Sequence, residues 1–117
     1  MSDVVVYHNP RCSKSRQMLA LLDERGISFK TVLYMDQGLS AEEIRALLVK
    51  LGATARDLLR TSEDSYKQQN LADKSLDEAA LIDAMVNEPR LFQRPVVVCG
   101  DRAMIARPAE LALEILP

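Results

Sequence analysis

Short apolar runs and helical apolar stripes alternate along the chain, and together they predict an α/β domain. Apolar, mostly β-branched runs at residues 4–7 and 96–99 predict strands, and the first of these is expected to be buried. Residues 29–34 predict a second strand, and residues 102–106 predict a strand that returns from a turn at residues 100–101. A helical stripe follows the first strand and ends at Gly26, a common helix stop. The order strand, helix, strand is typical of a parallel βαβ unit, and the later pair is typical of a β-hairpin.

The middle of the chain is expected to be a helical block. Capping patterns and apolar stripes predict helices after Ser40, Thr54 and Ser75, with weaker helical character in residues 64–69. Pro108 fits the first turn of a last helix with an apolar face formed by Leu111, Leu113, Ile115 and Leu116. The expected order is β-α-β, a helical block and β-β-α, in a single domain over residues 1–117.

Composition and charge exclude several classes of protein. A net charge of -2 gives no reason to expect a nucleic-acid or membrane surface, and no apolar run approaches the roughly 20 residues of a membrane span. The first residues lack the pattern of a signal peptide. Cys12 and Cys99, the two cysteines, are 87 positions apart, which fits neither a disulfide framework nor zinc spacing. We expect a soluble, cytoplasmic, monomeric protein with reduced thiols.

Cys12 is the strongest candidate for chemistry, because it lies in a polar loop between a predicted strand and a predicted helix. Backbone N–H groups and the dipole at a helix start favour thiolate over thiol, and the thiolate is the nucleophile. Arg11, Lys14 and Arg16 surround this thiol, and no carboxylate follows until Asp23. Such a cluster of cations opposes the helix dipole unless an anion binds there. The alternative for Cys12 is an inert, buried thiol.

The residues around Cys12 leave several roles open. Ser15 completes a C-x-x-S pattern, so no local disulfide can form and a resolving thiol must come from another molecule. Cys99 is the one internal candidate, and its place at the end of an apolar strand predicts a core residue. His8 either packs at the strand end or lowers the thiol pKa as a cation or hydrogen-bond donor. Ser15 either donates a hydrogen bond to the thiolate or caps the helix.

Three arginines far from Cys12 in sequence are further candidates. Arg60 ends a leucine-containing helical segment, where a cation is also explained by the helix dipole. Arg94 and Arg107 flank the two hairpin strands, and strand pairing should bring these ends together. An oxyanion bound between two guanidinium groups would explain why they are held close to each other, because each group can bind it through two hydrogen bonds. The alternative for each arginine alone is a solvated surface charge.

The stretch His8-Asn9-Pro10-Arg11-Cys12-Ser13-Lys14-Ser15-Arg16 resembles the active-site loop of the ArsC family, the glutaredoxin-coupled arsenate reductases. Residues 58–60, 87–89, 94–98 and 107–110 resemble further segments of that family, in the same order and with matching spacing. The resemblance implies a thioredoxin-like α/β fold with a mixed sheet and a helical insertion. It covers nearly the whole chain.

The resemblance also implies roles for individual residues. Cys12 would be the nucleophile, with His8 lowering its pKa and Ser15 assisting. An oxyanion-binding trio would consist of Arg60, Arg94 and Arg107. Pro95 matches the cis-proline of thioredoxin-like folds.

The implied reaction is arsenate reduction, a step in arsenic detoxification. Arsenate would form an adduct with Cys12, glutathione would reduce it as co-substrate, and glutaredoxin would resolve the remaining mixed disulfide. The protein itself would need no metal and no bound cofactor. One alternative is a glutathione-dependent thiol–disulfide oxidoreductase that does not act on arsenate. The other is a non-catalytic, polymerase-binding regulator, and Ser15 together with the arginine trio argues against it.

Overall fold

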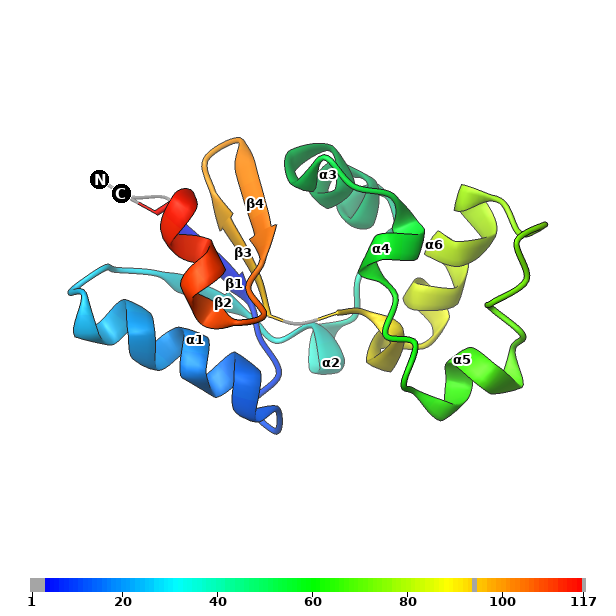
Figure 1. Cartoon of the computed structure of the whole chain (residues 1–117), viewed down its shortest axis with the longest axis horizontal. Coiled ribbons are helices and arrows are strands. Elements are labelled where there is room, and N and C mark those ends of the chain that lie inside the picture. The colour runs from blue at the N-terminus through cyan, green and yellow to red at the C-terminus, as the bar shows by residue number, and fades with distance from the viewer. Residues whose placement is uncertain (1–3, 94, 117) are drawn as a thin grey trace. The chain divides into compact units, whose positions relative to one another are not determined.

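The computed structural model of the chain describes residues 4–93 and 95–116. The chain falls into two compact units, one formed by residues 1–37 with 94–117 and the other by residues 38–93 (Figure 1). The single domain expected over residues 1–117 stays a prediction.

The first unit is built on a four-stranded mixed sheet. Its strands are β1 (Val4–Tyr7), β2 (Lys30–Val32), β3 (Val96–Cys99) and β4 (Arg102–Ile105). Their order across the sheet is β2-β1-β3-β4, with β1 parallel to β2 and antiparallel to β3, and with β3 antiparallel to β4. The βαβ unit and the hairpin predicted from the sequence are therefore both confirmed.

Helix α1 (Ser13–Glu24) and the 3-10 helix η2 (Ala109–Glu114) cover one face of this sheet (Figure 1). Val6 and Val97, which are register partners on β1 and β3, pack with Met18 of α1 and Ala112 of η2 in one buried cluster. Helix α1 ends at Glu24, and the chain then turns at Gly26, whose φ of +66 costs glycine little. This packing fixes the start of α1 beside the end of β1.

Two predictions for the first unit are wrong in detail. The strand expected over residues 29–34 ends at Val32, because its partner β1 ends at Tyr7, and the chain then turns into α2 (Tyr34–Gln37). The last helix is a 3-10 helix with Ala109, Ala112 and Ile115 buried, whereas Leu111 is exposed. Buried residues spaced by three fit the three residues per turn of a 3-10 helix.

The second unit consists of helices. They are α3 (Ala41–Leu51), α4 (Ala55–Leu58), α5 (Asp64–Gln68), α6 (Glu78–Asn87) and the 3-10 helix η1 (Pro89–Leu91). Ser40 accepts a hydrogen bond from the N–H of Glu43 and caps α3 as predicted. The predicted capping box at Ser75 is wrong, because the Asp77 carboxylate caps α6 by accepting from the N–H of Ala80 over 2.9 Å. Across residues 4–93 and 95–116, no helix is long and apolar enough to cross a membrane.

Candidate active site

Cys12 occupies the N-cap position of α1, at the end of the loop that follows β1. Its backbone is extended, its N–H donates to the carbonyl oxygen of Asn9 over 3.0 Å, and its carbonyl oxygen accepts from the N–H of Arg16 over 3.1 Å. The residue is half-buried, and the first turn of α1 holds no acidic residue. Both cysteines are thiols. Cys12 therefore lies where the N–H groups of the helix start favour a negative charge, as the sequence predicted.

Side-chain hydrogen bonds hold the loop before Cys12 against α1. The Asn9 carboxamide oxygen accepts from the N–H of Arg11 over 3.0 Å, and the Arg16 guanidinium donates to the carbonyl oxygen of Pro10 over 2.8 Å. The N–H of Asn9 donates to the hydroxyl oxygen of Ser15 over 3.4 Å. Asn9 is buried and Ser15 is fully buried. The contribution of Asn9 was missed by the sequence analysis. An Asn side chain that accepts a hydrogen bond from the backbone N–H two residues later is nevertheless common in turns.

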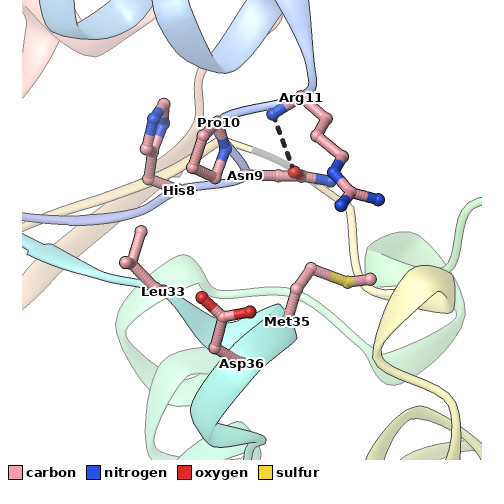
Figure 2. Close-up of a pocket in the computed structure, with 7 residues that line it drawn as sticks. All are labelled: His8, Asn9, Pro10, Arg11, Leu33, Met35 and Asp36. Carbon is pink, nitrogen blue, oxygen red and sulfur yellow. Dashed lines mark hydrogen bonds between the residues drawn. The ribbon is translucent and has the colours of Figure 1, made fainter.

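His8 is buried, with only 6% of its surface exposed. Its backbone N–H donates to Val32, and its Nδ1 has no hydrogen-bond partner among the described residues. Burial lowers the pKa of His8 below the usual 6.5, and the positive charge of Arg16 lowers it further. Figure 2 shows the imidazole ring directed away from Leu33 and Asp36. A neutral ring at pH 7 favours the hydrogen-bonding role of His8 over the cationic one.

Arg107 lies two positions after the end of β4 in the first unit and is half-buried. The hairpin pairing extends one step beyond the strands, because the N–H of Ala106 donates to the carbonyl oxygen of Pro95 over 2.9 Å. The residues adjoining positions 94 and 107 are thus paired, as the hairpin argument expected. Arg94 itself, and with it the Arg94–Pro95 bond expected to be cis, lies outside the described residues. The Arg107–Pro108 bond is cis.

Arg60 lies in the second unit, whereas Cys12, His8, Ser15 and Arg107 lie in the first. The Arg60 side chain is 16% exposed, and its Nε lies 3.4 Å from Oε1 of Glu63. Its Nη1 donates to the Gln93 carboxamide oxygen over 3.2 Å, and its backbone N–H donates to Leu91 over 2.7 Å. Arg60 is therefore a positioned guanidinium within its unit and not a solvated surface charge.

Cys99 lies on β3, beside the end of β1 that is farther from the Cys12 loop. It ends β3 and is the register partner of Val4, whereas Tyr7 at the far end of β1 leads into the Cys12 loop. Cys99 is partly buried and packs against the core of the first unit, which confirms its predicted packing but not full burial.

A pocket of about 380 Å³ lies directly beside the Cys12 loop. The side chains that line it are His8, Asn9, Pro10, Arg11, Leu33, Met35 and Asp36 (Figure 2). The last three were missed by the sequence analysis, which placed Leu33 in a strand and gave no role to Met35 and Asp36. A signal was present: the carboxyl ends of two adjacent parallel strands meet at one edge of a sheet, so residues after β2 must lie near residues after β1. Within the described ranges, no group of three or more His, Cys, Asp or Glu side chains could hold a metal ion.

Comparisons with known proteins agree with this architecture. The profile of the ArsC family matches residues 7–115. The chain is 53% identical to the uncharacterized protein YfgD of Escherichia coli (strain K12), covering 97% of this chain and 96% of that one. It is 43% identical to a protein of Haemophilus influenzae named arsenate reductase, covering 97% and 98%. A solved structure of an arsenate reductase from Vibrio cholerae matches with a TM-score of 0.95 and 45% identity, covering 98% of each chain.

Proposed function

Because this chain belongs to the ArsC family and has a thioredoxin-like α/β fold, we propose that it is an arsenate reductase that converts arsenate to arsenite through Cys12. The position of Cys12 carries the proposal. It is a thiol at the N-cap of a helix with cations and no carboxylate in its first turn. That environment favours both a thiolate and a bound oxyanion. We place the reaction in the cytoplasm and assign it to the monomer.

The first step in this proposal joins sulfur to arsenic. Arsenate is a multiply charged oxyanion, and its transfer from water needs matching cations and N–H donors. The oxyanion ligands in this scheme are Arg60, Arg94 and Arg107, together with the first-turn N–H groups of α1. The Cys12 thiolate attacks arsenic, an S–As bond forms, and one As–O bond breaks as that oxygen takes up protons and leaves as water. His8 and Ser15 assist by hydrogen bonding near the thiolate.

The second step transfers two electrons to arsenic. Glutathione, as co-substrate, attacks the sulfur of Cys12, so that an S–S bond forms and the S–As bond breaks. The bonding pair stays on arsenic, which passes from the +5 to the +3 state, while each of the two sulfurs gives up one electron. The thiol proton goes to the departing arsenite. Glutaredoxin then removes glutathione from Cys12 by thiol–disulfide exchange and restores the thiol.

The position of Cys99 supports a reductant from outside the chain. Val4, its register partner, and Tyr7, which leads to the Cys12 loop, are separated by the length of β1. Three residue steps along a strand span roughly 10 Å. Cysteine Cα atoms more than about 7 Å apart cannot form a disulfide without backbone movement. Cys99 is therefore a poor resolving thiol for Cys12.

The test is arsenate turnover with glutathione and glutaredoxin, comparing the wild type with Cys12→Ser and with Cys99→Ser as the matched control. We expect Cys12→Ser to fall to the background rate and Cys99→Ser to retain activity. Equal turnover by Cys12→Ser and wild type would remove Cys12 from the mechanism. Removal of glutathione from mixed disulfides by the wild type, without arsenate reduction, would instead support a thiol–disulfide oxidoreductase.

A further inference from the structure

The pocket beside Cys12 has two walls that come from different strands. One wall is the loop after β1, residues 8–11, and the other is the segment after β2, residues 33–36. The N–H of His8, which donates to the carbonyl oxygen of Val32 over 3.0 Å, joins the two walls at their base. The volume of about 380 Å³ lies in the range of small-molecule sites, roughly 300–1,000 Å³.

The two walls carry opposite charges. Arg11 belongs to the first wall and Asp36 to the second, and Figure 2 shows the Asp36 carboxylate directed toward the loop that carries Arg11. Both residues are exposed, and neither side chain forms an ion pair with another described residue. Pro10, Leu33 and Met35 supply apolar surface to the same pocket. The pocket thus presents a cation, an anion and apolar surface.

We propose that this pocket binds the thiol co-substrate, a small peptide thiol that carries both a carboxylate and an ammonium group, such as glutathione. A carboxylate of the ligand pairs with Arg11 and its ammonium group pairs with Asp36. Arsenate is a poor occupant, because the Asp36 carboxylate repels a multiply charged anion. This assignment rests on the proposed function for the reaction that the bound thiol performs.

The pocket wall includes the residue that directly precedes Cys12. Cys12 directly follows Arg11, and consecutive Cα atoms are about 3.8 Å apart. A thiol whose charged ends are held at Arg11 and Asp36 can attack the Cys12 sulfur of the arsenate adduct as described above. Holding the thiol there converts an encounter between two molecules into a positioned reaction.

Binding is tested with S-methylglutathione, whose blocked sulfur cannot react, and with its N-acetyl derivative, which lacks the ammonium charge. We expect S-methylglutathione to shift the backbone NMR signals of residues 8–11 and 33–36 in the wild type. N-acetylation should weaken binding roughly three- to fivefold, the effect of one exposed ion pair. In Asp36→Asn the two probes should bind equally, whereas Asp23→Asn, an exposed carboxylate on α1, should behave like the wild type. Shifts clustered elsewhere, or an undiminished effect of N-acetylation in Asp36→Asn, would overturn the assignment.

Kinetics separate this assignment from the proposed function. Asp36→Asn should raise the KM for glutathione roughly three- to fivefold, and should change the KM for uncharged 2-mercaptoethanol by less. Arsenate reduction with an unchanged KM for glutathione would overturn the pocket while the reductase stands. Binding of S-methylglutathione at the pocket without arsenate reduction by any thiol would overturn the reductase while the pocket stands.

Discussion

The N–H of Asn9 donates to the hydroxyl oxygen of Ser15, so that the loop before Cys12 is tied to the first turn of α1. Ser15 is fully buried there, six residues after the group it bonds. The bond makes the position of Cys12 depend on a side chain three residues further along the chain.

Ser15→Ala removes the hydroxyl oxygen that accepts this bond, so the N–H of Asn9 loses this acceptor. We expect the free energy of unfolding to fall by about 1 kcal/mol, measured by urea denaturation. Alkylation of Cys12 by iodoacetamide at pH 7 should also slow, since the loop loses its anchor. Ser13→Ala, an exposed serine in the same turn, is the matched control and should change stability by less than about 0.5 kcal/mol. Equal losses in both variants would contradict the anchoring role.

The burial of His8 predicts a particular pH dependence. Its folded pKa is lowered, first by burial and then by Arg16, below the unfolded value near 6.5. The unfolded chain therefore binds a proton more readily, so the contribution of His8 to stability is complete above about pH 6.5 and is lost as the pH falls through the folded pKa. The free energy of unfolding, measured from pH 8 to pH 5, should decline more in the wild type than in His8→Gln.

Arg16→Met provides the check on the two causes. Because burial is the larger cause, the His8 pKa followed by NMR should rise only part of the way back toward 6.5 in this variant. Arg25→Met, an exposed arginine at the other end of α1, should leave the pKa in place. A His8 that already titrates at 6.5 in the wild type would contradict the argument.

We expect a substitution of Arg60 to change the KM for arsenate, an effect that can be separated from a change in stability. In Arg60→Lys the planar fork is lost while the charge remains, and we expect the KM for arsenate to rise about tenfold or more. Arg56→Lys is the matched control, because Arg56 donates to the carbonyl oxygens of Leu71 and Asp73. It should lower the melting temperature without changing the KM. A KM that moves equally in both variants would show that Arg60 acts only through the folding of its unit.

The N-cap of α6 indicates that Asp77, and not Ser75, contributes to the stability of the second unit. Asp77→Ala removes the acceptor for the N–H of Ala80 and should cost about 1 kcal/mol in the free energy of unfolding. Asp77→Asn should be tolerated. Ser75 bonds Asp73 instead and does not cap the helix, so Ser75→Ala should cost less than Asp77→Ala in the same denaturation experiment. A larger loss in Ser75→Ala than in Asp77→Ala would instead support the capping box at Ser75 that the sequence predicted.

The elements that the sequence predicted well are those whose local pattern has one interpretation. The runs at residues 4–7 and 96–99 are β-branched throughout or nearly so, and both are strands. The segment at residues 29–34 failed because the length of a strand depends on its partner, and β1 offers pairing only to Val32. At the chain's end, the leucines suggested an α-helical face, whereas small alanines spaced by three are what packs closely against the sheet.

The features of the candidate site that depend on neighbouring residues in the sequence could be predicted, whereas those that depend on tertiary packing could not. The place of Cys12 at a helix start follows from a polar loop between a strand and a helical stripe. Asp36 could not be assigned, because its approach to the Cys12 loop depends on the parallel pairing of β1 with β2 and on the turn after Val32. The neutral state of His8 likewise depends on burial, which adjacent residues do not specify.

The placement of Cys99 has a practical consequence for measurements on this protein. A thiol packed against the core, at the far end of β1 from Cys12, gives every molecule a built-in standard for chemical labelling. The ratio of label on Cys12 to label on Cys99, read by mass spectrometry from one digest, reports how reactive Cys12 is whatever the protein concentration or the age of the reagent. Each variant considered above that keeps both cysteines can thus be compared with the wild type without adding a further thiol.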